Sequence, residues 1–318
     1  LFLMPVNIIF LTRLYYRIGR DQGMKPHDRL SVRPTRLGRL EHRIAFFWRR
    51  RKRTWPLYAG VAVIYVGLAL IVGFKASDSL VYAKWSVLIS AHRGDSEHVP
   101  ENSLPSIAAA IDKGIQSVEL DVQLSKDGVA VLFHDYNVKR LTGVSARVSE
   151  LPFEELGRLV IGKDAAGEAV RIPTLVEALA EANGRIKLLL DLKPYGSGDK
   201  LAQEVVKLVK SFGMEQEVYV QSFDSYALRH IRAIAPEIRI GQILYFALGD
   251  LSALDVDFYT IEQVMLTEQL VAKAHAAGRE VWVWTVNSRH NLKEVLKYRI
   301  DGIITDYPVL AQSMVELN

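Results

Sequence analysis

The sequence contains no cysteine. This absence excludes a disulfide framework, catalysis by a thiol and any zinc site that is built on cysteine ligands. A domain without disulfides depends on its hydrophobic core for stability. A chain of 318 residues is long enough for one large domain or two ordinary ones.

Most of the chain also lacks an excess of basic residues. Residues 13–54 contain fourteen Lys and Arg against three Asp and Glu, a net charge of +11, whereas residues 1–12 carry no charge. The whole chain has a formal net charge of +4, so residues 55–318 carry −7. A domain that binds nucleic acid needs a basic face of its own. We therefore expect no nucleic-acid partner for this larger, acidic part.

Residues 55–74 are twenty positions without a charged side chain. As a helix this run would be about 30 Å long at ~1.5 Å per residue, which matches the apolar core of a bilayer. A signal peptide is the alternative, but the run is longer than its apolar region and shows no small-residue cleavage motif. Five basic residues, 49–53, directly precede the run. The positive-inside rule then predicts a transmembrane helix at 55–74, with the chain beyond it on the extracytoplasmic side of the cell membrane.

The first residues are apolar as well. We expect residues 1–12 to be the end of an earlier membrane helix. The alternative is an isolated hydrophobic N-terminus, which would show the same apolar pattern. Residues 13–54 would then form a basic cytoplasmic loop that contacts anionic lipid headgroups. Residues 75–86 are expected to link the membrane helix to a domain at 87–318.

Two carboxylates, Glu119 and Asp121, lie within an apolar run. Side chains two positions apart on a strand point to the same face, so these groups would lie side by side. Their repulsion requires that one is protonated or that a cation lies between them. Oxygen ligands suit a hard ion such as Mg²⁺ or Ca²⁺. The alternatives are a solvated strand face or a pair that Lys or Arg neutralises.

Further polar motifs surround this pair along the chain. The first group comprises His92-Arg93-Gly94, Pro100-Glu101-Asn102-Ser103, Glu119-Leu120-Asp121, Asp127-Gly128 and His134-Asp135. Downstream follow 172–175, Asp191-Leu192-Lys193, Gln221-Ser222-Phe223, 284–287 and 301–308. In this order, the set resembles the glycerophosphodiester phosphodiesterase family from about residue 87 to the C-terminus.

The pattern beyond residue 87 predicts the fold class. Short apolar runs are expected as strands at 87–91, 117–122, 187–192, 218–222, 238–243, 256–261, 281–286 and 302–305. Amphipathic helices are expected between most of them, for example at 201–212, 225–235, 267–277 and 291–298. Eight alternating strands and helices predict an α/β fold, a (β/α)₈ TIM barrel. Residues 129–133 follow a tight turn and are expected to form a hairpin after the second strand. Residues 136–186 are expected to be a strand-free insertion beside the barrel mouth.

The barrel would bring most of these motifs together, because its active sites lie at the carboxyl ends of the strands. Polar groups that only cap helices are the alternative. The resemblance implies that Glu119, Asp121 and Asp191 hold one divalent cation, Ca²⁺ or Mg²⁺. Asp191 stands where many relatives have glutamate, and Ser103 where threonine is commoner.

The resemblance also implies roles for the remaining site residues. Arg93 and Lys193 are expected to be catalytic and to bind the phosphate, since a phosphodiester resists attack until its charge is neutralised. His92 and His134 are expected to divide the roles of base and acid. Trp284 is expected to contact the substrate, with simple core packing as the alternative. Glu101 and Asn102 would orient the first loop.

Three functions remain open at this point. The first is metal-dependent hydrolysis of glycerophosphodiesters to glycerol 3-phosphate and an alcohol by a membrane-anchored extracytoplasmic domain. The second is a lipid phosphodiesterase of the lysophospholipase D or sphingomyelinase D type, acting on a phospholipid-derived substrate. It would need an apolar groove, with Leu151, Phe153, Tyr245 and Phe246 as its candidates. The third is a catalytically inactive binding module associated with the membrane.

Overall fold

The computed structural model describes residues 17, 59–70, 85–245 and 251–315. The chain divides into two units, Leu1–Gly73 and Phe74–Asn318. In the first unit, residues 59–70 form a helix in which Val63, Tyr65 and Leu70 are largely exposed. Among the described residues, no helix combines the length and the apolar character that crossing a membrane requires.

Several predicted segments fall wholly or partly outside the described residues. The predicted membrane helix 55–74 extends past the described helix at both ends. Residues 1–12, the basic segment 13–54 apart from Arg17, and all but the last two residues of the linker 75–86 also lie outside.

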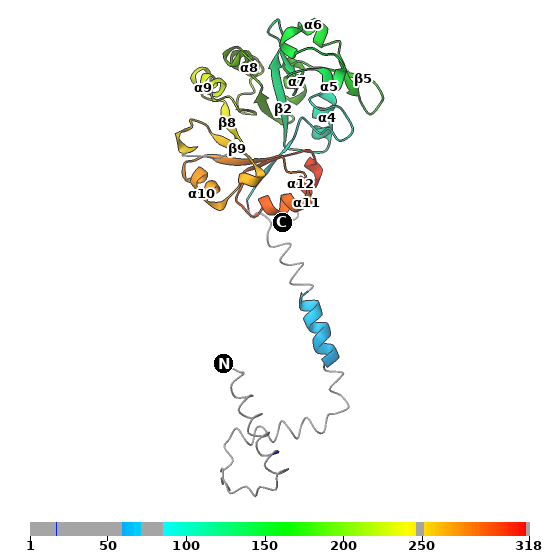
Figure 1. The fold of residues 1–318 in the computed structure, drawn as a ribbon, viewed down its shortest axis with the longest axis vertical. Coiled ribbons are helices and arrows are strands. Elements are labelled where there is room, and N and C mark those ends of the chain that lie inside the picture. Colours follow the sequence, from blue (N-terminus) through cyan, green and yellow to red (C-terminus); the bar gives the residue numbers. More distant parts are fainter. Residues whose placement is uncertain (1–16, 18–58, 71–84, 246–250, 316–318) are drawn as a thin grey trace. The chain divides into compact units, whose positions relative to one another are not determined.

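The second unit is built on eight parallel strands (Figure 1). They are β1 (Leu88–Ala91), β2 (Ser117–Leu124), β6 (Lys187–Leu192), β7 (Val218–Ser222), β8 (Arg239–Leu244), β9 (Phe258–Glu262), β10 (Glu280–Trp284) and β11 (Gly302–Thr305). Each strand pairs with its neighbour in chain order, and β1 pairs with both β2 and β11. The sheet is therefore closed, and the predicted barrel is confirmed.

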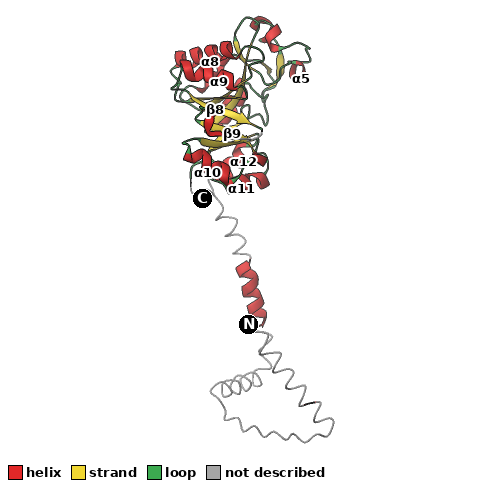
Figure 2. Cartoon of the chain, turned by 60° about the vertical axis from the view of Figure 1, so that its left-hand side comes forward, coloured by secondary structure: helices red, strands yellow, loops and turns green. Residues whose placement is uncertain are grey.

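Helices surround this sheet (Figure 2). They are α4 (Leu104–Asp112), α7 (Leu175–Ala182), α8 (Gly198–Phe212), α9 (Ser225–Ile234), α10 (Glu268–Ala276), α11 (Arg289–Val295) and α12 (Pro308–Val315). Each has an apolar side: α8 buries Leu201, Val205 and Val209, which recur every four residues. Between β8 and β9, described residues 251–257 contain only the short 3₁₀ helix η2 (Leu251–Ala253), and a second one, η3 (Gln263–Met265), follows β9.

The insertion after the second strand differs from its prediction. The strand β3 (Ala130–Leu132) pairs antiparallel with β2, as expected. Beyond it come α5 (Lys139–Thr142), η1 (Val148–Glu150) and α6 (Phe153–Leu156), and then β4 (Val160–Lys163) and β5 (Ala169–Arg171), which pair with each other. The prediction of a strand-free insertion is therefore wrong.

The insertion has a small core of its own, to which Val138, Val148, Leu156, Ile161 and Val170 contribute. Both missed strands are short, and each buries only one residue, Ile161 or Val170. So short a run has too few alternating apolar positions to indicate a strand.

The barrel interior has an apolar floor. Leu189, Tyr219, Phe258, Trp282 and Ile304 form a cluster separate from the core between strands and helices. Glycines on the adjacent strands leave space for two of the large rings. A Cβ at Gly241 on β8 would lie 2.0 Å from Phe258 on β9, and one at Gly302 on β11 would lie 2.2 Å from Trp282 on β10.

Polar side chains lie above this floor. Two positions further along their strands, on the same interior face, stand Asp191, Gln221 and Thr260. The packed rings close the barrel below this polar layer and keep water from it on that side.

Candidate active site

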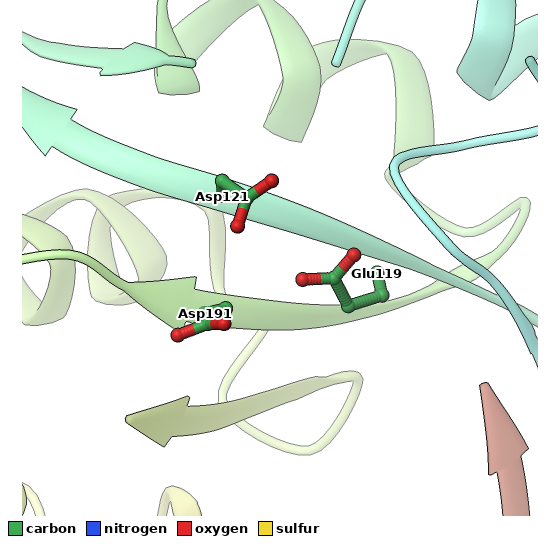
Figure 3. A group of neighbouring side chains, drawn as sticks. All are labelled: Glu119, Asp121 and Asp191. Carbon is green, nitrogen blue, oxygen red and sulfur yellow. The ribbon is translucent and has the colours of Figure 1, made fainter. Parts of the chain in front are cut away.

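Three carboxylates meet at the barrel mouth (Figure 3). Glu119 and Asp121 lie on β2, and Asp191 lies on β6 directly opposite Asp121 in the strand register. One oxygen of each lies within 4.8 Å of the others, and all three side chains are buried. Strand spacing predicted the first two as neighbours, and the family resemblance added Asp191 as a third ligand. The parallel pairing of β2 and β6 places Asp191 beside them.

The carboxylates differ in their protonation. Burial, together with the charge of Asp121, raises the pKa of Glu119 to about 7. Burial also raises the pKa of Asp191 to about 8, against the opposing effect of Lys193. For Asp121 the burial effect is outweighed by Lys193, His134 and Arg93, so its pKa is lowered. Without a cation, three negative charges do not coexist here near neutral pH.

These residues fit a divalent cation. The donor set is three oxygens, as hard ions prefer. Moreover, Asp191 Oδ1 is buried without a hydrogen-bond partner. A buried oxygen in this condition is costly unless a ligand supplies the missing interaction.

Lys193 follows β6 and lies against the same carboxylates. Its Nζ donates to Asp191 Oδ2 at 2.6 Å and lies 3.2 Å from Asp121 Oδ1. Burial alone would lower the pKa of this amine, but the charges of Asp191 and Asp121 outweigh it and raise the pKa. The predicted phosphate ligand is therefore a charged lysine at the edge of the acidic group.

Arg93 begins the loop after β1 in a left-handed conformation, with φ of 57°. This turns its backbone N–H toward Glu119 Oε2, at 3.0 Å. Its Nη1 donates to Glu101 Oε1 at 2.9 Å, while its Nε is buried without a hydrogen-bond partner, 3.4 Å from Asp121 Oδ2. Gly94 is required next, because its φ is +82° and a Cβ would lie 2.1 Å from Ser106 Oγ. Arg93 thus has one N–H beside the acidic group that makes no hydrogen bond.

Asn102 and Ser103 organise the rest of this loop. Asn102 Nδ2 donates to Asp121 Oδ2 at 2.8 Å, and its Oδ1 accepts from the Asp121 N–H at 2.9 Å. Ser103 caps α4, accepting from the Ser106 N–H. Asn102 therefore orients a carboxylate as well as the loop, a contact that sequence reasoning did not predict.

Each of the two predicted catalytic histidines contacts a carboxylate through its Nδ1 atom. His92 Nδ1 lies 2.6 Å from Asp306 Oδ1, and His134 Nδ1 lies 2.8 Å from Asp135 Oδ1. A carboxylate at Nδ1 favours the proton there and leaves Nε2 for proton transfer. Burial alone would lower the pKa of His92, but the hydrogen bond that it donates to Asp306 and the charge of Glu119 outweigh it, so the pKa lies above 6.5.

Different side chains support the two aspartates. Asn287 Nδ2 donates to Asp306, and Asn287 Oδ1 accepts from the Asp306 N–H. Arg140 Nε donates to Asp135 at 2.5 Å. Asn287 and Asp135 lie within the motifs of the sequence, although their supporting roles were not predicted. Arg140 lies in the insertion, and no pattern in the sequence indicated a role for it.

The predicted site residues lie close enough for their charges to interact. The charges of His92 and Lys193 act to lower the pKa of Glu119. Those of Lys193, His134 and Arg93 act to lower the pKa of Asp121.

Trp284 lies at the end of β10, beside exposed rings. Its ring centroid is 5.1 Å from that of Tyr245 and 5.9 Å from that of Phe223, and these two rings stack at 4.8 Å. Lys193 Nζ lies 5.8 Å from the Phe223 centroid, which connects this aromatic wall to the acidic group. Trp284 Nε1 is buried without a hydrogen-bond partner.

The structure describes three of the four candidate residues for a lipid groove. Leu151 and Phe153 pack against the core of the insertion, whereas Tyr245 belongs to the aromatic wall. Phe246 lies outside the described residues.

Comparison with known proteins gives a consistent result. Residues 92–310 match the model of the glycerophosphoryl diester phosphodiesterase family. A glycerophosphodiester phosphodiesterase from Caldanaerobacter subterraneus is 34% identical over 233 residues, which cover 70% of this chain and 94% of the relative. One from Bacillus altitudinis is 29% identical, covering 69% and 94%.

A solved structure is similar as well. The Oleispira antarctica phosphodiesterase, in complex with the product sn-glycerol-3-phosphate, is 32% identical. It has a TM-score of 0.67 and covers 72% of this chain and 96% of its own. Fold, site geometry and these matches agree: the chain belongs to the glycerophosphoryl diester phosphodiesterase family.

Proposed function

We propose that the chain hydrolyses glycerophosphodiesters to glycerol 3-phosphate and an alcohol, with one divalent cation held by Glu119, Asp121 and Asp191. The observation that carries this proposal is the buried group of three carboxylates within 4.8 Å, with an unpartnered oxygen on Asp191. The product bound to the Oleispira relative supports the choice of substrate. When bound, the cation would stabilise negative charge on the phosphoryl oxygens.

The protein's own charges continue this neutralisation. Arg93 carries a positive charge and an Nε without a hydrogen-bond partner, and a guanidinium suits phosphate geometry. Lys193 adds a second positive charge beside Asp191. These groups reduce the repulsion between the substrate anion and an approaching oxygen nucleophile.

The two histidines carry the protons. One accepts a proton at Nε2 from the attacking hydroxyl group, which belongs to water or to the neighbouring glycerol carbon. The other donates a proton from Nε2 to the departing alkoxide as the phosphorus–oxygen bond breaks. If the glycerol hydroxyl attacks first, water opens the resulting cyclic phosphate in a second step. Asp306 and Asp135 keep both rings oriented throughout.

The aromatic wall of Phe223, Tyr245 and Trp284 is proposed to contact the organic part of the substrate. Phe223 and Tyr245 expose much of their surface, and Trp284 retains an unused N–H. Flat rings bury apolar carbons, and the indole N–H can donate to a hydroxyl or phosphate oxygen. The wall could make such contacts with the glycerol part of the substrate and with a range of alcohols.

Chelation and metal replacement test the proposed reaction. After treatment with a chelator, release of glycerol phosphate from glycerophosphodiesters that differ in their alcohol should cease. Ca²⁺, Mg²⁺ or Mn²⁺ should restore it, because the three carboxylates supply the ligands. A Trp284→Ala variant should show a weaker preference among the alcohols. Full activity in the presence of chelator would contradict the metal requirement. No release of glycerol phosphate with any substrate or metal would contradict the proposed reaction.

We further propose that the chain is anchored in the cell membrane, with the barrel outside the cytoplasm. The support is the uncharged run 55–74, the basic residues 49–53 before it, and the exposed apolar side chains of helix 59–70. Anionic lipid headgroups would be the partners of segment 13–54.

Membrane fractionation of cells tests this anchoring. We expect the full chain in the carbonate-washed membrane fraction, and a protease added outside intact cells or spheroplasts should degrade the barrel. A variant with three arginines in 59–70 should leave that fraction, since each charge opposes insertion. Recovery of the unchanged chain in the soluble fraction would contradict the proposal.

A further inference from the structure

Arg140 joins two loops that carry proposed catalytic groups. It lies in α5 of the insertion. Its Nε donates to Asp135 Oδ2 at 2.5 Å, while Nη2 and Nη1 donate to Glu101 Oε1 and Oε2 at 2.6 and 3.1 Å. One guanidinium therefore makes three hydrogen bonds to two carboxylates on different loops.

Each carboxylate in turn holds a proposed catalytic residue. Asp135 Oδ1 lies at His134 Nδ1, and Glu101 Oε1 accepts from Arg93 Nη1. A continuous chain of hydrogen bonds therefore joins His134 to Arg93. Its intermediate members are Asp135, Arg140 and Glu101. Arg140 contacts none of the three proposed metal ligands.

The environment distinguishes these contacts from an ordinary surface ion pair. Arg140 is 45% exposed, but its partners Glu101 and Asp135 are only 19% and 25% exposed, whereas Arg158 and Glu154, elsewhere in the insertion, are 74% and 78% exposed. Exposed single pairs contribute little, but a bidentate contact within a network fixes geometry. Although burial opposes it, the bond from Arg140 keeps the pKa of Glu101 below its ordinary value.

We infer that Arg140 is a positioning residue that sets the orientation of His134 and Arg93 together, so that the insertion takes part in building the active site. The inference rests on the proposed roles of these two residues. Because Arg140 acts through others, its loss should alter the rate of the reaction and leave metal binding intact. Lysine should not replace it fully, since one amine lacks the three-bond fork geometry.

Kinetics of Arg140→Ala in the full, metal-loaded chain test this inference. We expect kcat to fall by about 10- to 100-fold, as for other residues that orient catalytic groups. Arg140→Lys should lie between this variant and the wild type, and millimolar guanidinium should partly restore Arg140→Ala. Arg158→Ala, a matched change within the insertion, should keep wild-type kcat and gain nothing from guanidinium.

A double-mutant cycle with Asp135→Asn separates positioning from a general structural effect. If Arg140 acts through Asp135, the double variant should be no more than about twofold slower than the slower single variant. Fully additive losses, absence of guanidinium rescue, or an unchanged kcat in Arg140→Ala would each overturn the inference. If the wild type turns over no substrate with any metal, the proposed function fails and the inference fails with it. If His134→Gln is fully active, the proposed role of His134 and this inference fail, while the hydrolysis itself stands. If only Arg140→Ala is fully active, the proposed function stands and the inference fails.

Discussion

Glutamine in place of Glu119 is expected to remove metal binding and to lower kcat by about a thousandfold or more. An amide keeps the shape of the side chain but not its charge, so the site loses one of its three anionic ligands. A metal ion contributes several kcal/mol of transition-state stabilisation, and each ~1.4 kcal/mol is a factor of ten in rate. Calorimetric titration with Ca²⁺, Mg²⁺ and Mn²⁺, together with steady-state kinetics, measures both effects.

The same variant should be more stable than the wild type when both are free of metal. Burial and the charge of Asp121 raise the pKa of Glu119 from 4.5 to about 7. The folded state therefore binds this proton more tightly than the unfolded state does, and ionisation destabilises the fold as pH rises from about 4.5 through 7. Glu119→Gln removes that cost. Its advantage in free energy of unfolding should grow between about pH 5 and pH 8.

A control for the Glu119 variant comes from a carboxylate outside the site. Glu154→Gln makes the same chemical change on an exposed helix of the insertion. It should retain metal binding and activity, with a nearly unchanged free energy of unfolding. Normal turnover by Glu119→Gln would mean that the acidic group is not the catalytic metal site.

Glutamine at His134 is expected to lower kcat by about 10²- to 10⁴-fold, the range of general acid–base catalysis. The reason is the loss of Nε2, which Asp135 leaves available for proton transfer. Metal binding should persist, because His134 is not one of the three carboxylate ligands. His92→Gln should show a loss of similar size.

Substrates with different leaving groups can assign the two histidines. An aryl diester releases a phenolate that needs little protonation, so the variant that lacks the general acid should recover much of its rate. The variant that lacks the base should remain slow on both substrates. His98→Gln is a suitable control, since His98 lies in the first loop with a largely exposed side chain. Wild-type kcat in both His134→Gln and His92→Gln would contradict acid–base catalysis by this pair.

The fold was predictable because its strands are buried runs at regular intervals. The expected strands 187–192, 218–222 and 302–305 match β6, β7 and β11. The expected strand 281–286 is observed as Glu280–Trp284, although the N–H of Val286 still donates to Ile304 O on β11. The hairpin of β4 and β5 was missed because most of its side chains face solvent.

The motifs of the family predicted the main residues of the site, but from residue spacing alone the contacts were predictable only where they are local in the chain. The spacing of Glu119 and Asp121 follows from the two-residue period of a strand. His134 and Asp135 are adjacent, yet the bond between them is a matter of side-chain conformation. Arg140 could not be predicted, because its partner Glu101 is 39 residues away and an exposed arginine carries no pattern.

By itself, the sequence determined the order of strands and helices, the uneven distribution of charge and the motifs of the family. These features depend on residue type and on short periods that backbone geometry imposes. The tertiary structure decided how Asp191, which the motifs of the family had only named, is placed beside Glu119 and Asp121, because this depends on the register of β2 and β6. It also decided that Asp306 meets His92 across the closure of β1 on β11, 214 residues along the chain. Such contacts arise from the packing of whole strands and helices, which places side chains together regardless of their separation in sequence.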